Sequence, residues 1–121
     1  MSRILIVDDE ASIRLLYSQE LADEGYRVDA AASIAEALEL LGKNSYDLAL
    51  LDIKLKNESG LDLLQKLVKE QSEMAVILST AFSCYKDDFS AWLADSYVVK
   101  SSDMQELKDE IKRLLARKKA D

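Results

Sequence analysis

Short apolar runs recur along the chain, separated by longer stretches in which apolar residues return every three or four positions. A short run rich in Val, Ile and Leu is typical of a strand that is buried on both faces of a sheet. We therefore predict five strands, at Ile4–Val7, Tyr26–Ala31, Tyr46–Leu51, Ala75–Leu78 and Tyr97–Val99.

The longer stretches have the periodicity of amphipathic helices. The first predicted helix ends near Gly25, because glycine suits the position that follows a helix. The second begins at Ser33, which forms a capping box with Glu36, and can end at Gly42. Further helices are predicted from about Gly60, more weakly around Lys86–Leu93, and from Ser102, where Gln105 completes another capping box.

Strands that alternate with helices predict an α/β fold with a doubly wound parallel sheet, because each parallel crossover has to pass over one face of the sheet. Five strands and five helices fit the 121 residues of the chain, which is a usual size for one compact domain. The sequence shows no repeat, linker or low-complexity segment, and it contains no proline. We expect residues 1–121 to form a single domain.

An acidic composition excludes several classes of function. The formal net charge is −7, and no basic stripe is present that could neutralise a phosphate backbone, so we expect no binding to nucleic acid. The basic residues near the end of the chain fit a helix C-terminus, where cations offset the helix dipole; they are Arg113, Arg117, Lys118 and Lys119. Histidine is absent, which removes imidazole acid–base catalysis and most zinc and copper sites.

Cysteine usage and the apolar runs bear on localisation. Cys84 is the only cysteine, so no disulfide can form within the chain, which suits a reducing cytoplasm. Met1 leads directly into a predicted strand and not into the basic and apolar regions of a signal peptide. Runs such as Leu48–Leu51 are too short to cross a bilayer. We expect a cytoplasmic domain with no membrane partner.

Three aspartates lie where an open parallel sheet binds its ligands, at the carboxyl ends of strands. Asp8 and Asp9 directly follow the first predicted strand, and Asp52 directly follows the third. Each alone could cap a helix or occupy a turn. If the two strands are neighbours, however, the carboxylates converge and repel one another unless a cation lies among them. Oxygen ligands without His or Cys suit Mg²⁺, or alternatively Mn²⁺.

Two further polar residues end predicted strands at the same edge. Thr80 follows the fourth strand and Lys100 follows the fifth. A hydroxyl and an ammonium beside a metal–carboxylate site are the donors that a phosphoryl group requires. Taken singly, Thr80 is equally well explained as a strand residue and Lys100 as a solvated lysine. Their shared position with the aspartates favours a phosphoryl site.

Together these residues resemble the receiver domain of bacterial two-component response regulators, and the resemblance covers nearly the whole chain. It rests on Asp8-Asp9 after the sequence Ile-Leu-Ile-Val, on Asp52 and Gly60, on Thr80-Ala81, and on Tyr97 through Lys100. The resemblance implies a flavodoxin-like fold with strand order 2-1-3-4-5. Known receivers are phosphorylation-switched signalling domains, and they catalyse only their own phosphorylation and dephosphorylation.

The resemblance also implies a role for each site residue. Asp52 would accept a phosphoryl group from the phosphohistidine of a sensor histidine kinase or a phosphotransfer protein. Asp9 would ligate Mg²⁺ directly and Asp8 largely through water, and Asp52 and the main-chain carbonyl of Lys54 would complete the metal ligands. The remaining roles fall to phosphate-binding Thr80 and Lys100, and to Tyr97, which would turn inward as a switch and signal to a downstream protein target.

The sequence departs from the family pattern at two usual proline positions, which hold Lys56 and Ser101. The segment between Thr80 and Lys100 is also shorter than is common. A cis peptide before a residue other than proline costs roughly 2.5–4 kcal/mol, so we predict a trans Lys100–Ser101 bond. We also predict that the Lys100 ammonium lies within salt-bridge reach of Asp52.

Two alternative functions remain open. One is a receiver-like interaction module that signals without phosphorylation, although such a module would be expected to lose some of the acid, threonine and lysine set. The other is an enzyme or carrier of the flavodoxin type. Its phosphate-binding loop would be rich in Ser, Thr and Gly, whereas Asp8, Asp9 and Glu10 follow the first strand here.

Overall fold

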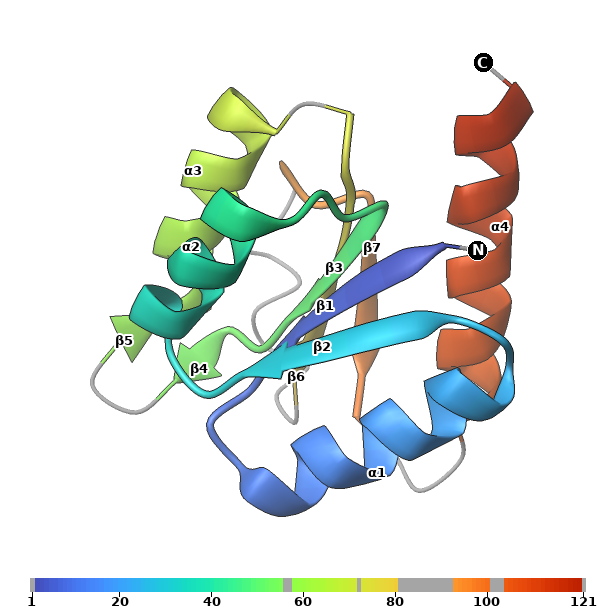
Figure 1. Cartoon of the computed structure of the whole chain (residues 1–121), viewed down its shortest axis with the longest axis horizontal. Helices are drawn as coiled ribbons and strands as arrows, with labels where there is room; N and C mark the ends of the chain where they lie inside the picture. Colours follow the sequence, from blue (N-terminus) through green and yellow to red (C-terminus); the bar gives the residue numbers. More distant parts are fainter. Residues whose placement is uncertain (1, 56–57, 72, 81–92, 101–103, 121) are drawn as a thin grey trace.

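One parallel sheet forms the centre of the molecule (Figure 1). The computed structural model describes residues 2–55, 58–71, 73–80, 93–100 and 104–120. The sheet has the order β2-β1-β3-β6-β7. Counted along the chain this is the order 2-1-3-4-5, so the predicted doubly wound sheet is confirmed, and its strand bounds differ from the predicted ones by at most two residues. They are β1 (Arg3–Val7), β2 (Arg27–Ala31), β3 (Leu48–Leu51), β6 (Ala75–Thr80) and β7 (Ser96–Val99).

Helices cover both faces of the sheet. Figure 1 shows α2 (Ile34–Lys43) and α3 (Gly60–Glu70) on one face and α1 (Ala11–Asp23) and α4 (Gln105–Ala120) on the other. The last helix begins at Gln105, and Ser102, its predicted cap, lies outside the described residues. The helix predicted around Lys86–Leu93 falls almost entirely in the segment 81–92, which is also outside them, as is Cys84.

The core consists of two apolar layers, because successive side chains of a strand point to opposite faces of the sheet. In β1, Leu5 and Val7 pack in the layer beneath α2 and α3. Ile4 and Ile6 pack in the layer beneath α1 and α4. The strands β1 and β3 are buried on both faces, so the register of these two strands is fixed from both sides of the sheet.

The helix termini follow the predicted chemistry in part. Gly25 follows α1 with φ 93°, its N–H donates to the Ala22 carbonyl at 3.0 Å, and the Tyr26 N–H donates to Leu21 at 3.2 Å. These two hydrogen bonds make up a Schellman motif, so the predicted helix end at Gly25 is confirmed. The prediction that Gly42 ends the second helix is wrong, because α2 continues through Lys43. Asn44 is its C-cap residue.

The capping box at the start of α2 is also modified. The Ser33 hydroxyl accepts from the Glu36 N–H at 3.2 Å, as predicted. The Glu36 carboxylate, however, accepts from Ala32 and not from Ser33, at 2.5 Å. The reciprocal bond therefore falls one residue before the cap.

A small hairpin interrupts the loop that follows the third strand. β4 (Lys54–Leu55) and β5 (Glu58–Ser59) pair in antiparallel fashion, with Lys54 opposite Ser59 and Leu55 opposite Glu58. The sequence predicted only a loop here, because strands of two residues are too short to show alternation. The hairpin places Ser59 as the N-cap of α3, where its hydroxyl accepts from the Leu61 N–H at 3.2 Å.

Among the helices that the structure describes, none combines the length and the apolar character needed to cross a membrane.

Candidate functional site

Two aspartates are held side by side at the carboxyl edge of the sheet. The parallel pair β1–β3 ends with Val7 opposite Leu51, so the next residues, Asp8 and Asp52, extend the same ladder. The Asp8 N–H donates to the Ala31 carbonyl at 3.1 Å and the Asp52 N–H donates to the Val7 carbonyl at 3.0 Å. Both aspartates are buried, with 3% and 5% of their surface exposed. The predicted convergence of strands one and three is confirmed.

Lys100 bridges these two carboxylates. Its Nζ lies 2.6 Å from Asp8 Oδ2 and 3.0 Å from Asp52 Oδ2, and only 11% of its side chain is exposed. The predicted salt bridge between Lys100 and Asp52 is therefore confirmed. The peptide bond to Ser101 lies outside the described residues, so its predicted trans isomer stays a prediction.

Burial and the ion pairs shift the pKa values of Asp52 and Lys100. Burial raises the pKa of the Asp52 carboxyl group above its usual value, and the opposing hydrogen bond from Lys100 does not cancel the effect. Burial alone would lower the pKa of Lys100, but its hydrogen bonds to Asp8 and Asp52 outweigh this and raise it. The buried ammonium is thus held in its charged form by two carboxylates.

The turn after β1 is fixed by contacts that leave its carboxylates close together. The Glu10 N–H donates to Asp8 Oδ1 at 2.9 Å, and Arg14 Nη1 of α1 donates to the Asp8 carbonyl at 2.7 Å. Carboxylate oxygens of Asp8, Asp9 and Glu10 all lie within 4.8 Å of one another. Sequence reasoning placed Asp8 and Asp9 in the site but gave Glu10 no role there, although its position in the Asp-Asp-Glu run was the available signal.

The hairpin after β3 supports Asp52 from the other side. The Lys54 N–H donates to Asp52 Oδ1 at 3.3 Å. Gly60 approaches the same backbone, because its N–H donates to the Ile53 carbonyl at 2.6 Å. A Cβ at Gly60 would overlap the Asp52 carbonyl oxygen and lie 2.9 Å from the carbonyl carbon. Only glycine fits at this position without a shift of the Asp52 main chain.

Two hydroxyl groups beneath the aspartates were not predicted. Tyr17 of α1 and Ser79 of β6 line a small pocket together with Asp8 and Asp52, and both are 3% exposed. Burial raises the pKa of Tyr17, and the nearby Ser79 hydroxyl opposes this. The pair does not reach good hydrogen-bond geometry, and Ser79 Oγ is left without a partner. In the sequence, Tyr17 is indistinguishable from an ordinary core residue of a helix.

The other two predicted site residues, Thr80 and Tyr97, lie on β6 and β7. Thr80 ends β6 and pairs with Val99, so its backbone lies at the carboxyl edge as predicted, while its side chain is outside the described part. Tyr97 of β7 is partly buried and packs against the layer beneath α2 and α3. It therefore lies on the opposite face of the strand from Val98, which packs in the other layer.

The donor set suits a hard divalent cation. Lys100 contacts Asp8 and Asp52 at once, so oxygens of these two carboxylates are close enough to share a single cation. Asp9 and Glu10 lie next to Asp8, and the Lys54 main chain lies next to Asp52. Carboxylate and carbonyl oxygens without imidazole are the ligands that Mg²⁺ prefers. The residues present therefore fit magnesium.

Comparison with known proteins agrees with this geometry. Residues 4–112 match the model of the response regulator receiver domain family. The response regulator ArlR of Staphylococcus saprophyticus is 36% identical over 120 residues, which is 97% of this chain and 54% of ArlR. The two-component response regulator PhoP of Pseudomonas aeruginosa is 33% identical, over 95% of this chain and 52% of PhoP. The chain thus spans about half the length of these curated relatives.

Solved structures of receiver proteins match nearly the whole chain. The response regulator TrrA of Thermotoga maritima, in complex with Mg²⁺ and BeF, is 46% identical with a TM-score of 0.90, covering 94% of this chain and 99% of that one. TrrA in complex with the histidine kinase ThkA superposes with a TM-score of 0.88, covering 95% and 99% of the two chains. A CheY-like receiver domain from Methanospirillum hungatei is 34% identical with a TM-score of 0.93, over 99% and 98%. The chain belongs to the response regulator receiver domains of two-component systems.

Proposed function

We propose that Asp52 accepts a phosphoryl group from the phosphohistidine of a sensor histidine kinase or a phosphotransfer protein, in a reaction that depends on Mg²⁺. Phosphorylation switches residues 1–121, acting as a single receiver domain, and the signal leaves through a contact with a downstream protein. The observation that carries the proposal is the Lys100 ammonium, 3.0 Å from Asp52 and 2.6 Å from Asp8 in a buried site at the sheet edge.

The proposed chemistry needs a nucleophile and neutralised charge more than acid–base groups. An Asp52 carboxylate oxygen attacks phosphorus in line with the leaving nitrogen, so that an O–P bond forms while the N–P bond breaks. The electron pair of the N–P bond stays on the imidazole of the donor, which takes a proton from solvent. Lys100 would bind a phosphoryl oxygen, as a cation that burial has already desolvated.

Mg²⁺ would be held by Asp8, Asp9 and Asp52 with the carbonyl of Lys54, and when bound it supplies positive charge that offsets the charge of the phosphoryl group. The chain's own contacts prepare these ligands. Asp8 is oriented by the Glu10 N–H, and Asp52 by the Lys54 N–H. TrrA was solved with Mg²⁺ and BeF, which supports a magnesium site in this chain.

The proposed switch uses Thr80 and Tyr97. Thr80 would bond a second phosphoryl oxygen, and Tyr97 would turn further inward in response. The complex of TrrA with its histidine kinase supports a kinase as the phosphoryl donor. The net charge of −7 favours a protein over nucleic acid as the target of this domain. We propose that the domain is a phosphate acceptor and not an enzyme that acts on a separate substrate.

Intact-protein mass spectrometry after incubation with acetyl phosphate tests the proposal. We expect one added phosphate in the presence of Mg²⁺ and none after chelation. Asp52→Asn should abolish the addition. Asp47→Asn is the matched control, because Asp47 lies at the other end of the same strand segment and an Asn there can still accept from the Arg3 N–H.

Labelling of the Asp52→Asn variant at the wild-type level would refute the assignment of the acceptor. A folded wild-type protein that takes up no phosphate would favour the alternative, a receiver-like module that signals without phosphorylation. Equal labelling with and without Mg²⁺ would remove the metal from the proposal.

A further inference from the structure

The β4–β5 hairpin needs an anchor of its own. It begins two residues after Asp52, at Lys54, whose N–H donates to the Asp52 carboxylate. The hairpin has only two residue pairs, and so short a ribbon is not stable by itself. The chain contains no proline, so no ring restricts the backbone between Asp52 and Gly60. Contacts with the rest of the domain must therefore set the position of Lys54.

Glu58 supplies one such contact. Its Oε2 accepts from the Ile34 N–H at 3.1 Å, across 24 residues of sequence. Ile34 is the first residue of α2, where N–H groups have no partner within the helix and a negative charge is favoured by the helix dipole. Ser33 and Glu36 also bind N–H groups at this terminus, but both are local to the helix. The Glu58 contact links the helix to the acceptor loop.

Burial of an apolar side chain also holds the hairpin. Leu55 of β4 is 4% exposed and belongs to the core layer against which Ile34 packs. Leu55 and Glu58 are also opposite each other in the hairpin. One pair of the hairpin is therefore held at both of its residues, Leu55 in the core layer and Glu58 at the start of α2, and the neighbouring pair contains Lys54.

We propose that Glu58 is a positioning residue of the acceptor site, which fixes the Lys54 main chain by tying the hairpin to the N-terminus of α2. The proposal rests on the function proposed above, because the Lys54 N–H orients Asp52 and the Lys54 carbonyl is among the proposed Mg²⁺ ligands. Loss of the contact leaves the apolar Leu55 to hold the hairpin and lets the Lys54 carbonyl move relative to Asp52.

The test compares Glu58→Ala, Glu58→Gln and Glu36→Ala. Mg²⁺ titration by calorimetry should show an affinity several-fold weaker in Glu58→Ala and close to wild type in Glu58→Gln, which keeps the acceptor oxygen. Glu36→Ala is the matched control. It removes a contact at the same helix terminus without touching the hairpin, so it should lower stability while leaving Mg²⁺ affinity unchanged.

A second measurement needs neither metal nor a phosphoryl donor. The Lys54 amide resonance and its hydrogen exchange should change in Glu58→Ala and return toward wild type in Glu58→Gln, with no change in Glu36→Ala. Wild-type Mg²⁺ affinity in Glu58→Ala, or an equal loss of affinity in Glu36→Ala, would overturn the proposal. If the wild-type protein bound no Mg²⁺, the proposed function would fail, and an unchanged Lys54 amide would then overturn the tether separately.

Discussion

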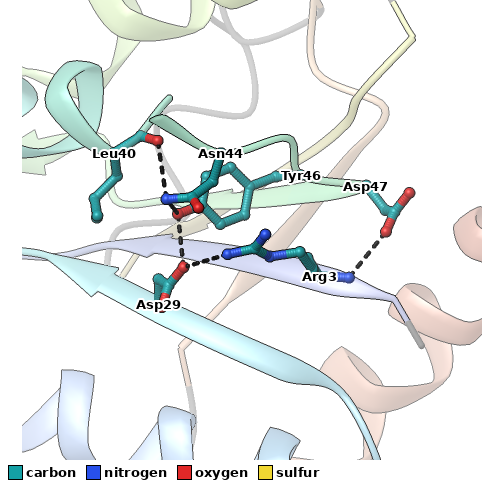
Figure 2. Close-up of polar contacts among 6 residues, drawn as sticks. All are labelled: Arg3, Asp29, Leu40, Asn44, Tyr46 and Asp47. Carbon is teal, nitrogen blue, oxygen red and sulfur yellow. Dashed lines mark hydrogen bonds and ion pairs between the residues drawn. The ribbon is translucent and has the colours of Figure 1, made fainter. Parts of the chain in front are cut away.

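The two edges of the sheet both gather charged side chains, but only one of them buries the charges. At the amino edge, Figure 2 shows a network centred on Asp29. The Tyr46 hydroxyl donates to Asp29 at 2.7 Å, and the Arg3 guanidinium lies 3.4 Å from the same carboxylate and 5.3 Å from the Tyr46 ring centre. Asn44 donates to Leu40, and the Arg3 main chain donates to Asp47. The Arg3 and Asp29 side chains are 27% and 35% exposed.

At the carboxyl edge the charges are taken out of water. The side chains of Lys100 and Asp8 are only 11% and 4% exposed, and one ammonium serves two carboxylates. Burying ions costs free energy that apolar residues of similar size would not cost. Folding alone does not require this arrangement, whereas the amino edge combines neutral donors with a partly exposed ion pair. The difference fits the function proposed for the carboxyl edge, while the contacts at the amino edge contribute to stability.

Removing the cation at each edge should give the largest contrast. Lys100→Met leaves Asp8 and Asp52 buried without a counter-charge, so we expect the free energy of unfolding to fall by about 3–5 kcal/mol in metal-free buffer. Arg3→Met loses a partly exposed ion pair and a cation–π contact and should cost about 1 kcal/mol. Urea unfolding measures both. Millimolar Mg²⁺ should recover part of the loss in Lys100→Met and none in Arg3→Met, and equal losses would contradict the comparison.

Alanine substitutions at two glycines compare the start of α3 with the last turn of α2. Gly60→Ala forces a Cβ against the Asp52 carbonyl, and we expect it to cost about 1–3 kcal/mol. Gly42 lies near the C-terminus of α2, and an added Cβ would meet nothing within 4 Å. Gly42→Ala should therefore stabilise the protein by about 0.5–1 kcal/mol. Thermal unfolding would show opposite shifts, and a shift of the same sign would mean that the close approach at Asp52 relaxes freely.

Tyr46→Phe tests the amino edge alone and should cost about 1 kcal/mol, for the loss of the hydrogen bond to Asp29. Burial, with help from that bond, raises the pKa of Tyr46 to about 12 from 10.0. The folded protein thus holds the phenolic proton more tightly than the unfolded chain. The stabilisation that follows from the raised pKa is fully present below about pH 10 and is lost as the pH rises through about 12.

Urea unfolding of wild type and Tyr46→Phe between neutral and strongly alkaline pH would measure it. The stability difference between the two proteins should shrink across that window. A difference that stays constant to the highest pH would mean that Tyr46 does not titrate as the structure indicates.

The sheet and its acidic site could be predicted from the sequence because both depend on local patterns. Buried parallel strands are short apolar runs, and Asp8 and Asp52 directly follow two of them. Those patterns do not report contacts between elements distant in sequence. The Tyr17–Ser79 pair joins a helix to a strand, and Glu58 caps a helix that begins 24 residues earlier, so neither leaves a periodic signal.

The position of β7 at the edge of the sheet bears on how the domain can move. Among the described residues it is the edge strand of the sheet and pairs only with β6. It can therefore slide or tilt without breaking pairs with a second described strand. Lys100 and Tyr97 are three positions apart, and the pleat therefore sends them to opposite faces. A displacement of Lys100 toward the acidic side chains would move β7, and Tyr97 on the other face of the strand would move with it. An edge strand can be displaced at a lower cost in free energy than a central strand. The edge strand β7 connects the acidic pocket to the core layer beneath α2 and α3.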